Sequence, residues 1–305
     1  MKKTLFAIMA IAALAASCNK ADVIETAPGQ AIDFGAPFVD NATKATDPTY
    51  SGTAELKAFN VYGTVTGTAG TVNIFDGVAV TGTVGATEWS YDAQYNQYWI
   101  PGASYKFAAV VDATSVTLGD YDMPSALTYA TESQKDMLYA EATVANATAN
   151  QGVVNFTFNH LLSKAQFTVT SNAQGGYYHS VTGIKVSNFE TGTYTINGGT
   201  WAGTTAKDIV FGAVEKVTST DTDGKTNATQ MLLIPNAETF NVTFTVDLYK
   251  NDVKLGTETK TIAVENDLMK GNAYNFTIDC EVGAPIKFTV TNDPAWAEQT
   301  DVTVQ

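Results

Sequence analysis

Arginine is missing from this sequence: all 17 of its basic residues are lysines, against 31 acidic residues. The net charge is −14 at pH 7, and the isoelectric point is about 4.4. Binding to nucleic acid depends on a basic stripe that displaces counterions from phosphates, and the sequence offers none. We therefore expect no nucleic-acid partner and no charge-driven attraction to anionic lipid.

Histidine and cysteine, which supply many catalytic and metal sites, occur only twice each. His160 lies in a break between two strand-like runs, which favours a structural role, and His179 has no neighbour spaced to share a metal. Asp221 and Asp223 lie in a glycine-containing turn and are interpreted as solvated, because a glycosidase would need its carboxylates in a cleft. No hydrolase, zinc-protease or phosphate-loop motif is present. The sequence predicts neither an enzyme nor a cofactor or metal site.

The N-terminus has the pattern of an export signal. Two lysines precede an apolar run at residues 5–16, which is shorter than the roughly 20 residues needed to cross a bilayer. The run ends in LAASC at residues 14–18, similar to the bacterial lipobox whose cysteine receives lipid. We predict removal of residues 1–17 and lipidation of Cys18; the alternative is an ordinary secretory signal before an incidental cysteine. A lipidated Cys18 leaves Cys280 unpaired, as a small buried hydrophobic residue.

Strands dominate the rest of the chain. Short alternating runs are separated by turns of glycine, asparagine and aspartate, without helical patterns between them, which is typical of antiparallel sandwiches. The sequence predicts an all-β protein with two β-sandwich domains, at residues 49–150 and 151–305. Residues 18–48 are predicted to hold a leader, a first strand and a linker.

Residues 153–170 change the phase of their alternation. Val154, Phe156 and Phe158 are apolar at even positions, whereas Phe167 and Val169 are apolar at odd positions. A straight strand cannot bury both sets, because a shift of one residue turns every side chain to the opposite face. We therefore predict a bulge, corner or short turn around His160, where two β-units join.

An aromatic stretch at residues 88–100 permits two interpretations. Its five rings belong to Trp89, Tyr91, Tyr95, Tyr98 and Trp99. Exposed and coplanar, they could stack against sugar rings; buried, they would fill the core of the first sandwich.

Several of these motifs, in this order, resemble the fimbrillin family, the lipoprotein-derived type V pilins of Bacteroidetes-type bacteria. They are LAASC at 14–18, Trp99 followed by YKFAA at 105–109, DMLYA at 136–140, VNFTFNHLLSKA at 154–165, LIP at 233–235 and KGNAY at 270–274. The resemblance covers nearly the whole chain. It implies two transthyretin-like sandwiches, export as a lipoprotein, and assembly into surface fimbriae.

The resemblance also implies how such subunits assemble. A protease removes the leader with its first strand, and a strand from a neighbouring subunit fills the open groove. Here the removable strand would be residues 32–38. The family's cut follows an arginine, which this chain lacks, so Lys44 is the candidate processing residue; alternatively, the linker stays uncut and the protein stays lipid-anchored. The candidate donor residues in the C-terminal tail are Ile286, Phe288, Val290, Val302 and Val304.

Together these observations predict a structural or accessory fimbrial subunit at the cell outer membrane that mediates adhesion. Its expected partners are other fimbrial subunits, the outer membrane through a lipid anchor, and a host protein or glycan. Its place as stalk, tip or anchor subunit stays open. The alternative is an outer-membrane lipoprotein with a glycan-binding sandwich.

Overall fold

A computed structural model describes residues 30–39, 49–50, 54–82, 88–227, 230–265 and 267–293. Within these ranges the chain forms strands, with only three short 3-10 turns: η2 (Ala93–Tyr95), η3 (Asp120–Asp122) and η4 (Thr131–Ser133). No helix in the described ranges has the length and apolar character needed to cross a membrane. The prediction of an all-β protein is confirmed.

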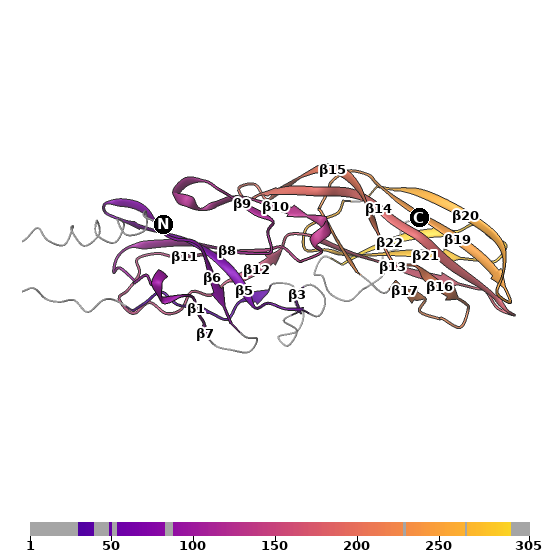
Figure 1. Cartoon of the computed structure of the whole chain (residues 1–305), viewed down its shortest axis with the longest axis horizontal. Coiled ribbons are helices and arrows are strands. Elements are labelled where there is room, and N and C mark those ends of the chain that lie inside the picture. Colours follow the sequence, from indigo (N-terminus) through magenta and orange to yellow (C-terminus); the bar gives the residue numbers. More distant parts are fainter. Residues whose placement is uncertain are drawn as a thin grey trace, which may run out of the picture.

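The molecule is elongated, and a six-stranded sheet forms one end of it (Figure 1). In spatial order its strands are β2 (Phe38–Val39), β12 (Thr157–His160), β11 (Leu138–Val144), β8 (Ser104–Val111), β5 (Ala58–Gly67) and β6 (Gly70–Thr81). A short pair, β1 (Phe34–Gly35) and β7 (Glu88–Trp89), lies apart from it. The N-terminal core, defined as the buried cluster around Phe34, Phe59, Phe75 and Phe107, draws on both.

Two facing sheets form the other end. The larger one runs β20 (Val253–Val264), β19 (Phe240–Lys250), β14 (Tyr177–Thr195), β10 (Pro124–Ala130) and β9 (Ser115–Leu118), with β15 (Thr200–Val210) and β16 (Val214–Val217) also on β14. The smaller one runs β17 (Lys225–Thr226), β13 (Ser163–Ser171), β21 (Ala273–Cys280) and β22 (Lys287–Asp293), with β18 (Met231–Leu233) on β13. Inner faces of both sheets supply the C-terminal core around Phe167, Phe244 and Phe276. A small hairpin of β3 (Thr49–Tyr50) and β4 (Ala54–Glu55) stands alone.

β14 connects the far end of the molecule to its middle. The alternating pattern predicts two short strands there, at residues 182–189 and 193–196, and this is wrong: one strand of 19 residues covers the first range and all of the second except Ile196. Its first half pairs with β19 and its end pairs with β10, so β14 continues beyond the C-terminal sandwich. A third buried cluster, which includes Tyr62, Leu127, Tyr129 and Leu161, fills the middle.

Strands on each side of the proposed domain boundary share sheets across it. β9 and β10 precede residue 150 and pair within the β14 sheet, while β12 follows residue 150 and pairs with β11. The division at residues 150 and 151 stays a prediction.

The phase change within residues 153–170 is confirmed. Phe156 and Phe158 are buried on one side of the break, and Phe167 and Val169 are buried on the other. β12 ends at His160 and β13 begins at Ser163, so the break consists of two residues that are both buried, Leu161 and Leu162. Because the chain bends there, both apolar sets reach a core.

Turns of glycine, asparagine and aspartate separate the strands as predicted, for example at residues 197–199 and 251–252. Gly198 and Gly199 both have positive φ in the turn from β14 to β15. Asn251 and Asp252 have φ of 47° and 63° between β19 and β20, as a primed two-residue hairpin requires.

Among the described residues, two pairs of named strands run parallel and the other pairs of named strands are antiparallel. β2 lies parallel to β12, and β21 lies parallel to β13 over eight register partners. Alternation of apolar residues reports which face is buried but carries no information on the direction of the neighbour. The sequence therefore did not predict either pair.

Candidate functional site

The N-terminal segment, residues 30–39, is built into the edge of the six-stranded sheet. Ile32 and Phe34 are fully buried. The Gly35 N–H donates to the Val154 carbonyl over 2.9 Å, and the Phe38 N–H donates to the Phe156 carbonyl over 2.9 Å. The segment thus forms a parallel partner for β12 and the residues before it, where the resemblance places the removable strand.

On its other side the N-terminal segment contacts the loop before β8. The Ile32 N–H donates to the Gln97 carbonyl over 2.8 Å, and the Trp99 N–H donates to the Gln30 carbonyl over 3.1 Å. The segment is therefore held between two parts of the chain, and its removal would leave backbone groups unpaired on both.

Phe34 lies at the centre of the N-terminal core. Its ring stacks on Phe156 at a centroid distance of 5.8 Å. It also makes edge contacts with four other rings, those of Phe59, Phe75, Tyr91 and Phe107. Loss of the N-terminal segment would therefore open an apolar groove lined by aromatic rings.

Gly35 allows this close approach. A Cβ at this position would lie 2.1 Å from Asn155 Oδ1 and 3.3 Å from Val153 Cγ2. Any other residue at this position would force the side chain of Asn155 to move. A glycine therefore suits the position where the N-terminal segment passes close to the residues before β12. The only signal for Gly35 in the sequence is that a small residue directly follows an apolar phenylalanine, which is too common a pattern to identify the position.

β22 contains two of the predicted donor residues, Phe288 and Val290, and lies at the edge of the smaller C-terminal sheet. Phe276 faces Val290 and Ile278 faces Phe288 across the antiparallel ladder with β21. Val290 is buried, whereas Phe288 is only partly buried, with its ring stacked 6.0 Å from those of Phe244 and Phe276. Among the described residues no strand pairs with the other side of β22. Ile286, just before β22, packs against the same core.

Four of the predicted site residues lie outside the described part of the chain. They are Cys18, Lys44, Val302 and Val304. Their predicted roles in lipidation, processing and strand donation stay predictions.

His160 is a structural residue, as predicted. It is buried, and its Nδ1 lies 2.5 Å from Asp136 Oδ2. Burial raises the pKa of the Asp136 carboxyl, and the hydrogen bond and charge of His160 oppose that shift. The pair joins the end of β12 to the turn before β11, and Asp136 had not been predicted as its partner.

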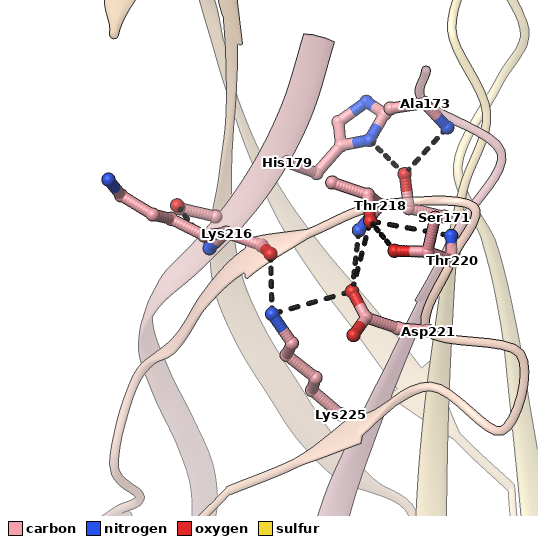
Figure 2. Close-up of polar contacts among 9 residues, drawn as sticks. Ser171, Ala173, His179, Lys216, Thr218, Thr220, Asp221 and Lys225 are labelled. Carbon is pink, nitrogen blue, oxygen red and sulfur yellow. Dashed lines mark hydrogen bonds and ion pairs between the residues drawn. The ribbon is translucent and has the colours of Figure 1, made fainter. Parts of the chain in front are cut away.

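His179 also has a structural environment (Figure 2). Its Nδ1 lies 2.7 Å from Ser171 Oγ, which in turn accepts the Ala173 N–H. Burial lowers the pKa of His179, so the neutral ring is favoured. Ser171 and His179 are in hydrogen-bond contact, but His179 is only 4% exposed and Asp221 accepts its hydrogen bond from Thr218. These three residues therefore do not form a catalytic triad.

Asp221 differs from the prediction that it is simply solvated. Its carboxylate accepts the Thr218 N–H over 2.9 Å and lies 3.4 Å from Lys225 Nζ (Figure 2). The Thr218 N–H, followed by Lys225, holds the pKa of Asp221 below its ordinary value. It therefore stabilises the turn before β17, whereas Asp223 is exposed as predicted. In the described ranges no group of three His, Cys, Asp or Glu residues could hold a metal.

The aromatic stretch at residues 88–100 is mainly core. Trp89 and Trp99 are 5% and 2% exposed, and Tyr91 donates a hydrogen bond from its hydroxyl to the Ile32 carbonyl. Only Tyr95 and Tyr98 are exposed, at 41% and 45%. Because three of the five rings are not exposed, the stretch does not form the exposed platform that sugar stacking would need, and the core interpretation holds.

Solved structures with the same fold come from several Bacteroides species. A fimbrial protein from Bacteroides vulgatus is 16% identical, covers 88% of this chain and 99% of its own, and has a TM-score of 0.63. Candidate cell adhesion proteins from Bacteroides uniformis and Bacteroides ovatus are each 17% identical, with TM-scores of 0.55 and 0.54. They cover 88% and 91% of this chain, respectively, and 99% of their own. A search of curated proteins finds no match.

At these identities the solved structures support the fold alone. The family assignment comes from the sequence model of the fimbrillin-like proteins, which matches residues 43–294 and so covers most of the chain. This chain belongs to the fimbrillin-like family.

Proposed function

We propose that the protein is a fimbrial subunit of the cell surface that assembles by strand addition and takes part in adhesion. The observation that carries the proposal is the burial of Ile32 and Phe34 in a segment paired along β12. Membership of the fimbrillin-like family supports it, as does the shared fold with a fimbrial protein and candidate cell adhesion proteins.

Export precedes assembly in this proposal. Residues 1–17 direct the chain out of the cytoplasm, and lipid on Cys18 anchors it to the outer membrane. Cleavage after Lys44 then releases the N-terminal segment together with the anchor. A subunit that escapes cleavage keeps its anchor and its closed groove, which suits the base of a fimbria.

The acceptor is the groove that the N-terminal segment leaves. It offers the carbonyls of Val154 and Phe156 for main-chain hydrogen bonds and the ring of Phe156 for apolar contact. Main-chain bonds give affinity in strand addition, and pockets for alternate side chains give specificity. Ile32 and Phe34 are two residues apart, so a donor needs apolar side chains at the same spacing.

The donor is the C-terminal tail of a neighbouring subunit. Ile286, Phe288 and Val290 have the required spacing, and Val302 with Val304 extend the pattern. The first three pack against their own C-terminal core in the isolated chain. Assembly therefore requires β22 to leave β21, an antiparallel partner that holds it from one side only.

Other copies or other fimbrial subunits are the partners that this chemistry selects. A stalk subunit needs both the groove and the donor, a tip subunit needs only the groove, and an anchor subunit keeps its lipid. A host protein or glycan is the target class for adhesion.

A disulfide that holds β22 in place tests the proposal. Thr277 and Thr289 face each other across the β21–β22 ladder. Directly opposed positions lie about 4.5–5.5 Å apart at Cβ, close to what a disulfide spans. The Thr277→Cys, Thr289→Cys double variant should form no polymer when oxidised and should recover polymer ladders on a gel when reduced.

Three controls accompany this test. Either single cysteine variant should polymerise in both redox states. Deletion of residues 285–305 should abolish polymer in a stalk subunit, and Lys44→Gln should leave the leader attached in mass spectra of the surface protein. Unchanged ladders from the oxidised double variant would contradict donation by β22.

A further inference from the structure

The two parallel strand pairs lie on one continuous piece of chain. β12 is the parallel partner of the N-terminal segment, and β13 is the parallel partner of β21. Only Leu161 and Leu162 separate β12 from β13. The proposed acceptor strand and the strand that holds β21 are therefore joined directly by covalent bonds.

Hydrogen bonds from three other parts of the chain hold this bend. The Leu161 N–H donates to the Met137 carbonyl over 3.0 Å, and Trp201 Nε1–H donates to the Leu161 carbonyl over 2.8 Å. The Gly271 N–H donates to the Leu162 carbonyl over 2.8 Å. Asp136 holds His160 just before the bend. Because Leu161 and Leu162 are also buried, the bend has no free space in which to straighten.

We propose that residues 154–171 are the force-bearing link of this protein, which carries tension from the N-terminal groove to the C-terminal end through two parallel strand pairs loaded in shear. The inference rests on the proposed function, because assembly through a groove and a tail decides where a filament would pull on each subunit. The strength of the link, however, is a property of the single chain.

The β13–β21 pair shows why the load is shear. Tension from the groove enters β13 at its N-terminal end, next to the bend, and tension from the tail leaves β21 at its C-terminal end, Cys280. Lys164 faces Ala273 at one end of the ladder, and Ser171 faces Cys280 at the other. Since the strands are parallel, the two forces act at opposite ends of the ladder. All hydrogen bonds of the ladder then resist the sliding of the two strands at the same time. If both strands were pulled at the same end of the ladder, the bonds would break one after another.

Side-chain bonds reinforce the same ladder. Thr168 Oγ1 lies 3.0 Å from Asn275 Oδ1, and Thr170 Oγ1 donates to Asp279 Oδ1 over 2.8 Å. Both bonds cross from β13 to β21. On the apolar faces of the two strands, the buried rings of Phe167 and Phe276 lie against each other with their centroids 4.9 Å apart. Sliding the strands would break these contacts together with the backbone bonds.

The β12 pair has the same geometry. Val154 and Phe158 face Phe34 and Val39 in the parallel direction. A donor that runs in the direction of the segment it replaces is pulled at its N-terminal end, while β12 is pulled at its C-terminal end. Both junctions along residues 154–171 therefore take the tension in shear.

Single-molecule pulling on the chain from residue 19 onward, with handles on two engineered cysteines, tests the proposal. Asn159→Cys with Val282→Cys pulls the β13–β21 pair from opposite ends. Gln174→Cys with Val282→Cys pulls it from one end. All three positions are exposed, and the native Cys280 is buried and common to both variants. We expect the unfolding force in the first direction to exceed that in the second by about twofold or more, because forced unfolding follows the barrier along the pulled coordinate. Equal forces would overturn the proposal.

A matched pair of substitutions locates the resistance. Thr170→Val removes the bond to Asp279 and should lower the force in the shear direction. Thr289→Val makes the same exchange on β22, outside the link, and should leave that force unchanged. A lower force for Thr289→Val but not for Thr170→Val would place the resistance elsewhere and contradict the assignment. Neither measurement needs a polymer, so the proposed assembly and the proposed link can fail separately.

Discussion

The two terminal strands close their cores in different ways. In the N-terminal segment, Ile32 and Phe34 are 0% exposed and lie between two parts of the chain. In β22, Val290 and Thr291 are buried, whereas Phe288 is only partly buried at the edge of a sheet. The first strand is part of its core, whereas the second covers its core from one side.

This difference fits the proposed assembly by strand addition, in which each terminus has a separate role. Removal of a strand that is held on both sides exposes a deep apolar groove, which must be refilled. An edge strand can leave by breaking one ladder, and the sheet beneath it keeps its other partners. The N-terminal end is therefore suited to accept a strand, and the C-terminal end is suited to donate one.

Substitution of Phe34 and of Phe288, one at a time, should give the largest effect on stability in a test of this comparison. Phe34→Ala should lower the free energy of unfolding of the unprocessed chain by about 3–5 kcal/mol, because the ring is fully buried among others. Phe288→Ala should cost about 1–2 kcal/mol, because the ring is only partly buried. Urea unfolding of the two variants and the parent provides the measurement.

The order of the two effects matters more than their size. A larger loss for Phe288→Ala would reverse the assignment of acceptor and donor ends. Tyr95→Ala is a useful control, because Tyr95 is an exposed ring of similar size and its loss should change stability little.

Hydrogen exchange should separate the two strands by a smaller margin. The amides of Gly35 and Phe38 donate to carbonyls inside the sheet, so we expect them to exchange only through extensive opening. The β22 amides that pair with β21 should exchange at least about tenfold faster, through local detachment of the edge. Mass spectrometry of peptides covering residues 30–39 and 287–293 would compare them. Equal protection would mean that β22 is not the weaker closure.

Alternation predicted which residues are buried much better than it predicted how strands connect. The phase change around His160 was visible because two apolar sets cannot share one face. The single long strand β14 was not visible in the alternation, because Glu190–Gly192 lacks large apolar residues. A Cβ at Gly192 would lie 3.0 Å from Ile234, so a side chain from outside the strand covers that position. Tertiary packing therefore replaced the local signal there.

Candidate site residues were predictable to different degrees. Phe288 and Val290 followed from alternation near the C-terminus, and the structure places both on one strand. The partners that define the acceptor, such as Val154 and Phe156 beside Phe34, are more than 100 residues away from it and share no local pattern with it. Cys18 and Lys44 depend on resemblance to export and processing signals, and they stay predictions.

Acid should weaken the C-terminal closure slightly. Burial lowers the pKa of His179 below its value of about 6.5 in an unfolded chain. The unfolded state therefore binds a proton first as the pH falls, so this contribution to stability is complete above pH 6.5 and is lost below it, toward the pKa of the folded state.

The location of His179 links this effect to β22. Its partner Ser171 faces Cys280 at the end of β21, the strand on which β22 lies. When the pH falls from about 7.5 to about 5.5, the free energy of unfolding in urea should decrease more for the parent than for His179→Gln. The difference between the two decreases should be smaller than the cost of Phe288→Ala. Because His160 is present in both proteins, the difference isolates His179. An identical loss in the two would show that the buried ring near Ser171 stays accessible to protons in the folded chain, and that the acid sensitivity of the C-terminal closure has another origin.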